Sequence, residues 1–293
     1  MGNRQFALKN HLAKAPNQKL SSYLPDLNRA NMRKSAAGVL RAFAILSVVF
    51  LLSAELPAQQ PIPMLILSGQ NNHDWQKTTP ALFQIFSGSK LFTVTVTNRP
   101  DTLKYTDYKR FRVVVSNWNQ WPDTAKRWNE DQEKAFTDYI RHGGGALFFH
   151  AGGSSFYGWQ DYHKIAIGRW GKKTSHGSIG PAEVRYTDEK HPVTKGLKDF
   201  SITDEIWENT EIHPGAVVLG TVQKMTDDGR LMTDGRQRMT DDGRLMTDGI
   251  PAIMVGKYGK GRSFYTILGH DEKVLGNAKL QKLLINGALW VGR

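Results

Sequence analysis

The chain of 293 residues contains no cysteine. That absence excludes a disulfide framework, a thiolate metal site and a cysteine nucleophile. It suits an oxidising compartment, where a free thiol is a liability, although cytosolic proteins can also lack cysteine. The G-x-S-x-G motif of serine hydrolases and the HExxH motif of zinc proteases are missing as well. Any catalytic or metal site must therefore be assembled from residues that are far apart in the sequence.

Concentrated positive charge is missing from most of the chain, although the formal net charge is +12. The first 58 residues hold eight basic and two acidic side chains, so they carry half of the excess. The remaining 31 basic and 25 acidic residues form no Lys/Arg cluster of the kind that binds a phosphate backbone. We therefore expect no nucleic-acid partner.

The apolar run at residues 42–54 is too short to span a bilayer comfortably, which takes about 20 residues. It has 13 residues, follows a basic stretch and precedes the small residue Ala58. This order is typical of a secretory signal peptide that begins at Met32. We expect residues 1–58 to be an N-terminal extension and signal peptide, and the remainder to be secreted or periplasmic. An uncleaved signal anchor is the alternative, and this segment is the one membrane contact expected.

Residues 63–293 alternate between strand-like and helix-like patterns, which is typical of one α/β domain. Short apolar or β-branched runs predict strands at 63–69, 91–97, 111–116, 146–149, 182–186 and 216–222. Residues 251–255 and 262–268 flank a glycine-containing turn and predict a hairpin. Amphipathic patterns predict helices at 78–87, 129–141 and 280–290. We predict a parallel sheet with helices on both faces, and residues 165–180 give no clear pattern.

Residues 222–249 contain a tandem duplication of 14 residues. Val222–Gly235 reads VQKMTDDGRLMTDG, and Arg236–Gly249 reads RQRMTDDGRLMTDG. Two short copies are too few for a solenoid, and Asp-Gly pairs favour turns, so we predict a duplicated surface loop or hairpin. A Ca²⁺-binding loop is the alternative, but the aspartate spacing does not match the EF-hand pattern.

Polar and aromatic side chains follow four of the predicted strands at the points where these strands end. They are His73, Asp74 and Trp75 after the first strand, Asn117 after the third, His150 after the glycine-flanked strand, and His270 and Asp271 after the last. In open parallel sheets ligands bind outside the carboxyl ends of the strands, so we expect these side chains to meet in one crevice. An imidazole paired with a carboxylate can transfer protons or bind a metal.

Each of these side chains also has a structural interpretation. A single histidine at a strand end is often a hydrogen-bonded structural residue, and Asp74 is also a suitable cap for the helix that follows it. His142 and His191 fit a helix C-terminus and a turn better than a site. Tryptophans near the expected crevice stack well on sugar rings but are equally common in cores; they are Trp75, Trp118, Trp159, Trp170 and Trp207.

Several segments together resemble the ThuA-like (trehalose-utilisation) family. They are His73-Asp74-Trp75 with Thr78-Thr79, the strand ending at His150-Ala151, residues 156–159, Gly168-Arg169-Trp170 with His176, residues 191–197, Asp204-Glu205 and residues 261–271. The likeness runs from about residue 63 to residue 293, with the duplicated loop as an unusual insert. It implies a flavodoxin-like fold related to class I glutamine amidotransferases, without their cysteine nucleophile. It also implies a link to the breakdown of trehalose and related disaccharides through keto-sugar intermediates.

We expect an enzyme that acts on a sugar or keto-sugar, as an isomerase, lyase or hydrolase. His150 and His270 would be the acid/base groups, Asp271 or Asp74 would orient them, and Glu205 would be a second carboxylate. The expected substrate-binding residues are His73, Asp74, Trp75, Asn117, Trp159 and His176.

Two alternatives stay open beside this expectation. The first is a metal-dependent hydrolase, in which a divalent metal cofactor binds ligands drawn from His73, His150, His176, Glu205 and His270. The second is a non-catalytic module that binds a carbohydrate. In all three the partner is a small-molecule carbohydrate, and no oligomeric state is predicted.

Overall fold

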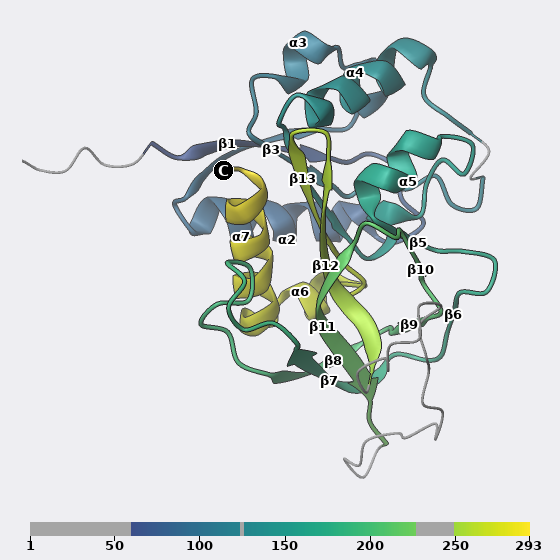
Figure 1. Cartoon of the computed structure of the whole chain (residues 1–293), viewed down its shortest axis with the longest axis vertical. Helices are drawn as coiled ribbons and strands as arrows, with labels where there is room; N and C mark the ends of the chain where they lie inside the picture. Colours follow the sequence, from purple (N-terminus) through teal and green to yellow (C-terminus); the bar gives the residue numbers. More distant parts are fainter. Residues whose placement is uncertain (1–59, 124–125, 227–248) are drawn as a thin grey trace, which may run out of the picture. The chain divides into compact units, whose positions relative to one another are not determined.

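The structure of the chain, a computed structural model, describes residues 60–123, 126–226 and 249–293, all of them within the unit Gln60–Arg293 (Figure 1). The expected signal segment lies outside these residues, and so does most of the duplicated loop. Among the described helices, none combines the length and the apolar character that crossing a membrane requires.

A nine-stranded sheet runs through this unit in the order β2-β1-β3-β4-β13-β12-β11-β7-β8. Its strands are β1 (Ile62–Leu67), β2 (Phe92–Thr97), β3 (Val113–Ser116), β4 (Gly145–Phe149), β7 (Gly180–Tyr186), β8 (Phe200–Asp204), β11 (Val217–Lys224), β12 (Ile250–Tyr258) and β13 (Gly261–Thr266). The first five strands in this order pair parallel, and the other pairs are antiparallel. The predicted α/β class is confirmed, with an antiparallel extension beyond β13.

The antiparallel part of the sheet begins at the predicted hairpin. β12 and β13 pair as far as Tyr258 and Gly261, and Gly259 between them has a φ of 59°. Because two strands joined by so short a turn must run antiparallel, β12 reverses the direction of the sheet. β11 and β7 continue by antiparallel pairing, which places the strands predicted at 216–222 and 182–186 in this part of the sheet.

Helices cover both faces of the sheet, as predicted. α2 (Trp75–Gly88), α6 (Glu272–Leu275) and α7 (Ala278–Val291) pack together on one face, and α3 (Tyr105–Tyr108), α4 (Glu130–Arg141) and α5 (Gln160–Ala166) lie on the other (Figure 1). The start of α4 follows from its sequence, because the Asn129 side chain accepts a hydrogen bond from the Gln132 amide and acidic residues fill the first turn. Two short 3-10 helices, η1 (Pro100–Thr102) and η2 (His150–Gly153), complete the helical elements of the described residues.

The carboxyl ends of β1, β3, β4 and β13 meet at one edge of the sheet, because these strands are parallel neighbours. Their bodies are closely packed: Met64 to Leu67 and Val113 to Val115 are each at most 2 % exposed. Full burial of such a side chain contributes about 1.5–3 kcal/mol. The apolar strand bodies therefore fix the starting points of the loops that carry the polar residues.

Four short strands add residues to the same region of the unit. They pair as β5 (Gly168–Arg169) with β10 (Glu211–Ile212), and as β6 (Ser175–His176) with β9 (Trp207–Glu208). Two of them fall in residues 165–180, for which no secondary structure was predicted.

Candidate functional site

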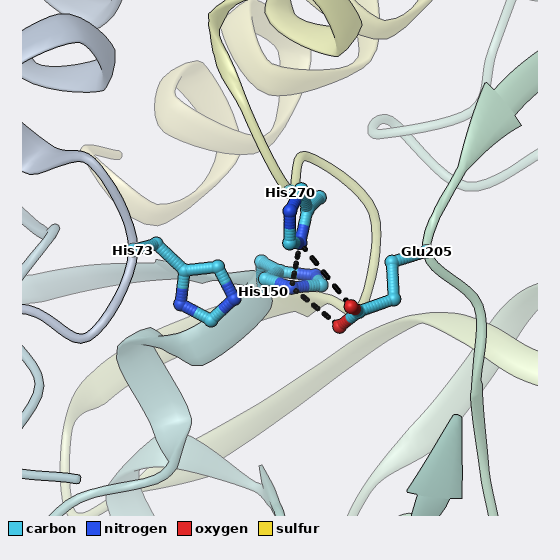
Figure 2. A group of neighbouring side chains, drawn as sticks. All are labelled: His73, His150, Glu205 and His270. Atoms are coloured by element: carbon cyan, nitrogen blue, oxygen red, sulfur yellow. Dashed lines mark hydrogen bonds and ion pairs between the residues drawn. The ribbon is translucent and has the colours of Figure 1, made fainter. Parts of the chain in front are cut away.

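Four side chains from separate segments converge beyond the strand ends (Figure 2). His73 lies in the loop between β1 and α2, and His150 follows β4 directly. Glu205 follows β8, and His270 lies between β13 and α6. One nitrogen or carboxylate oxygen from each residue lies within 4.8 Å of those of the other three. We call these four residues the His/Glu cluster.

Three members of the cluster form a compact triangle of side chains. His150 Nε2 lies 3.3 Å from His270 Nδ1 and 3.5 Å from Glu205 Oε1. His270 Nδ1 lies 3.6 Å from Glu205 Oε2. The His73 ring stands nearly perpendicular to the other two, with centroid distances of 4.7 Å to His150 and 4.8 Å to His270. Figure 2 shows one nitrogen of His73 directed toward His150 and the other turned away.

Hydrogen bonds outside the triangle set the orientation of its rings. His150 Nδ1 lies 2.7 Å from the carbonyl oxygen of Ile267, and because a carbonyl can only accept, Nδ1 is the donor. Neutral His150 therefore presents the lone pair of Nε2 to the cluster. His73 Nδ1 lies 3.2 Å from Asn71 Oδ1 and 3.1 Å from Asn72 Oδ1, which makes its Nε2 the free nitrogen.

A buried carboxylate, Asp204, fixes the backbone on both sides of the cluster. Its Oδ1 accepts from the amides of Glu205 at 2.8 Å and His270 at 3.2 Å, and its Oδ2 accepts from the Gly269 amide at 2.8 Å. Burial raises the pKa of Asp204, which is 1 % exposed. One side chain thus holds the segments that carry Glu205 and His270 in register.

The charges in the cluster are strongly coupled. Burial, and then the neighbouring His150, lower the pKa of His73 to about 3, so that this ring is neutral near pH 7. Burial alone would raise the pKa of Glu205, but hydrogen bonds from His150, His270 and Trp207 outweigh it and hold the pKa well below its usual range. The hydrogen bond to Glu205 raises the pKa of His270. Without a ligand, a proton is thus favoured on His270 beside an ionised Glu205.

The backbone at His150 is strained. Its φ of 42° lies in the left-handed region, which costs a residue with a side chain about 1–3 kcal/mol. The surrounding packing keeps this conformation, because the ring is bonded to Ile267 and the His150 carbonyl accepts from the Tyr265 hydroxyl at 3.1 Å. Strain of this kind concentrates at functional sites.

An open pocket of about 460 Å³ lies over the cluster. Its walls combine imidazole, carboxylate, amide and indole groups, from Asn72, His73, Asp74, Asn119, Trp121, Ala151, Ser154, Trp170, His176, Glu205, Trp207, His270 and Asp271. His150 is 2 % exposed and is not part of the wall, so it lies behind the residues that a pocket ligand would contact.

Most of the predicted site residues meet here, but two carboxylates have additional structural tasks. Asp74 caps α2 by accepting from the Lys77 amide and also pairs with the Lys77 ammonium at 3.0 Å. Asp271 caps α6 by accepting from the Val274 amide at 2.9 Å. Within the described residues, the carboxylate that reaches the imidazoles is Glu205, which also lies 3.3 Å from His176 Nδ1.

Three predicted substrate-binding residues lie outside the pocket wall. Asn117 is buried beneath it, where its amide donates to the hydroxyls of Thr78 and Thr79. Trp159 packs in an aromatic core group around Phe156. Trp75 is the first residue of α2.

Sequence reasoning missed Trp121 and the task of Asp204. Trp121 lies five residues beyond the end of β3, so the strand-end rule, extended along the loop, would have found it. Asp204 is the last residue of β8, a strand that the sequence pattern did not predict.

Comparison with known proteins agrees with this fold. A ThuA-like protein from Parabacteroides merdae is 24 % identical, with a TM-score of 0.63 over 79 % of this chain and 90 % of its own. A second, from Bacteroides uniformis, is 20 % identical, with a TM-score of 0.58 over 81 % and 94 %. A cytoplasmic protein from Salmonella typhimurium is 10 % identical, with a TM-score of 0.51 over 78 % and 98 %.

These structures show a glutamine amidotransferase-like fold. A comparison with curated protein sequences finds no match. The model of the ThuA family, described as trehalose utilisation, matches residues 64–291, and the chain therefore belongs to the ThuA family.

Proposed function

We propose that the pocket is the active site of an enzyme that acts on a sugar or keto-sugar. The observation that carries this proposal is the convergence of three imidazoles and one carboxylate, from four separate segments, beneath an open pocket. A solvent-facing group of titratable residues with strongly shifted pKa values is a recognised mark of an active site.

The substrate class follows from the pocket wall and from the family. The indole rings of Trp121 and Trp170 offer flat apolar faces, while Asn72 and Asp271 offer hydrogen-bonding groups. This mixture suits a sugar ring, which has an apolar face and a polar rim. The family is described by trehalose utilisation, which agrees with a carbohydrate substrate.

The proposed chemistry is proton transfer next to a sugar carbonyl or hydroxyl. Such a step needs a group within hydrogen-bond reach of the proton, and His270 and Glu205 both line the pocket. His150 lies behind them and orients His270 through the 3.3 Å contact between the two rings. The acid/base work expected of His150 and His270 is thus assigned to His270 and Glu205, with His150 as a positioning residue.

The test is a turnover assay of the full chain on disaccharides and their keto derivatives. His270→Ala and Glu205→Gln should each lower turnover at least 100-fold, as expected for loss of an acid/base group. His142→Ala is the matched control, since His142 is an exposed histidine that caps α4. Binding of these sugars without conversion would instead indicate a carbohydrate-binding module and would overturn the proposal.

A further inference from the structure

We infer that the His/Glu cluster binds one divalent first-row transition-metal ion through His73, His150, Glu205 and His270. The inference deepens the proposed function. It rests on that function only because both place the chemistry in the pocket. Four observations carry it: the spacing of the ligand atoms, the direction of the lone pairs, the charge of the group and the opening above it.

The spacing is that of a coordination shell. Ligand atoms arranged tetrahedrally at about 2.0–2.1 Å from an ion lie roughly 3.3–3.4 Å from one another. His150 Nε2 and His270 Nδ1 lie 3.3 Å apart, and they lie 3.5 Å and 3.6 Å from the two different carboxylate oxygens of Glu205, Oε1 and Oε2 respectively. These distances are long for hydrogen bonds, whose usual length is about 2.7–3.2 Å.

The lone pairs point inward because partners outside the cluster hold the opposite nitrogens. His150 donates Nδ1–H to the Ile267 carbonyl, and His73 Nδ1 faces the amide oxygens of Asn71 and Asn72. Metal-binding histidines show this same arrangement, in which the second nitrogen donates to a carbonyl and fixes the tautomer. The carboxylate is also held, since Trp207 Nε1 donates to Glu205 Oε1 at 2.9 Å.

The charge and the ligand types select the class of ion. Once His270 gives up its proton to bind the ion, three neutral imidazoles and one carboxylate give a group of charge −1, which a dication reverses without leaving a buried surplus of negative charge. Three nitrogen ligands suit Zn²⁺, Fe²⁺, Co²⁺ or Ni²⁺. Mg²⁺ and Ca²⁺ prefer shells made of oxygen and are not expected to bind.

His73 lines the pocket together with Glu205 and His270, so an ion among these side chains lies next to the open space. The ligand atoms of all four residues lie within 4.8 Å of one another, which is wider than the roughly 3.3–3.4 Å edge of a tetrahedral shell, so the four side chains would draw together on binding an ion. An ion bound in this way keeps positions that face the pocket. A sugar oxygen placed there would be polarised by the ion, and with the ion bound His270 and Glu205 would act on the sugar through the ion rather than as free acid/base groups.

The test is metal binding by the full chain after treatment with a chelator and dialysis. Titration with ZnCl₂, followed by calorimetry, should give one ion per chain, and CoCl₂ should give the visible absorption of Co²⁺ bound to nitrogen. His270→Ala and His73→Ala should each weaken Zn²⁺ binding at least tenfold, whereas His142→Ala should leave it unchanged. MgCl₂ in excess should not displace Zn²⁺.

Folding of each variant is checked by circular dichroism in chelator, and His270→Gln, which preserves bulk, replaces His270→Ala if the latter does not fold. Zn²⁺ binding that is absent, or equally strong in the wild type and in these variants, overturns the inference. The proposed function is judged separately. A chain that binds one ion but converts no sugar contradicts that function alone, and a chain that converts sugar while metal-free contradicts the metal centre alone.

Discussion

Replacing Asp204 by Asn isolates what the buried carboxylate contributes. Its two oxygens accept from the backbone amides of Glu205, His270 and Gly269. An Asn side chain has one accepting oxygen, and its NH₂ group would face an amide that needs an acceptor. Hydrogen bonds to a charged group contribute about 1.5–3 kcal/mol each, and a buried unsatisfied donor adds its own cost. We expect Asp204→Asn to lower the free energy of unfolding by about 2–4 kcal/mol.

The assay is urea denaturation of the full chain, with Asp271→Asn as the matched control. Asp271 also accepts a backbone hydrogen bond, but it does so as a helix cap, where Asn and Asp are nearly equivalent. Asp204→Asn should also weaken Zn²⁺ binding and slow turnover under conditions where the variant is fully folded. A loss of stability below about 1 kcal/mol, or an unchanged affinity for Zn²⁺, would refute the argument that this carboxylate positions Glu205 and His270.

Three further predictions address other parts of the chain. Unfolded His73 takes up a proton near pH 6.5, whereas the folded residue does so only near pH 3. The free energy of unfolding in chelator should therefore fall as the pH drops through this window. Urea denaturation at several pH values should show that this fall is smaller in His73→Gln than in the wild type, by about 2–4 kcal/mol. Trp159→Ala should cost about 3–5 kcal/mol of stability by leaving a cavity in the aromatic core. Trp121→Ala should instead leave the melting temperature nearly unchanged and weaken sugar binding. Equal effects of the two substitutions on stability would contradict the placement of Trp159 in the core and Trp121 in the pocket wall. Residues 32–58 should direct export, so that N-terminal sequencing of the exported protein begins near residue 59; a protein retained in the cytoplasm at full length contradicts this.

The part of the site that follows parallel strands could be predicted from the sequence. His73, His150 and His270 come after β1, β4 and β13, and the carboxyl ends of these strands share one edge of the sheet. Local apolar runs reveal such strands, and the topology of open parallel sheets then places their loops together.

Glu205 could not be predicted in this way. It follows β8, a strand that the sequence pattern did not predict; four successive antiparallel pairs from β13 give β8 the direction of the parallel strands, so its carboxyl end lies on the side of the cluster. Only the family resemblance indicated it. Trp159 shows a second limit, because an indole in a core and an indole in a pocket wall look alike in a sequence, and only packing separates them.

The central claim is that His73, His150, Glu205 and His270 form one metal-binding site beneath the pocket. The most direct measurement is the anomalous diffraction of crystals of the full chain grown with Zn²⁺, recorded on both sides of the zinc absorption edge. A single strong peak in contact with all three imidazoles and the carboxylate is the predicted result. Density without a peak there, with the four side chains too far apart to share any ligand, would contradict it.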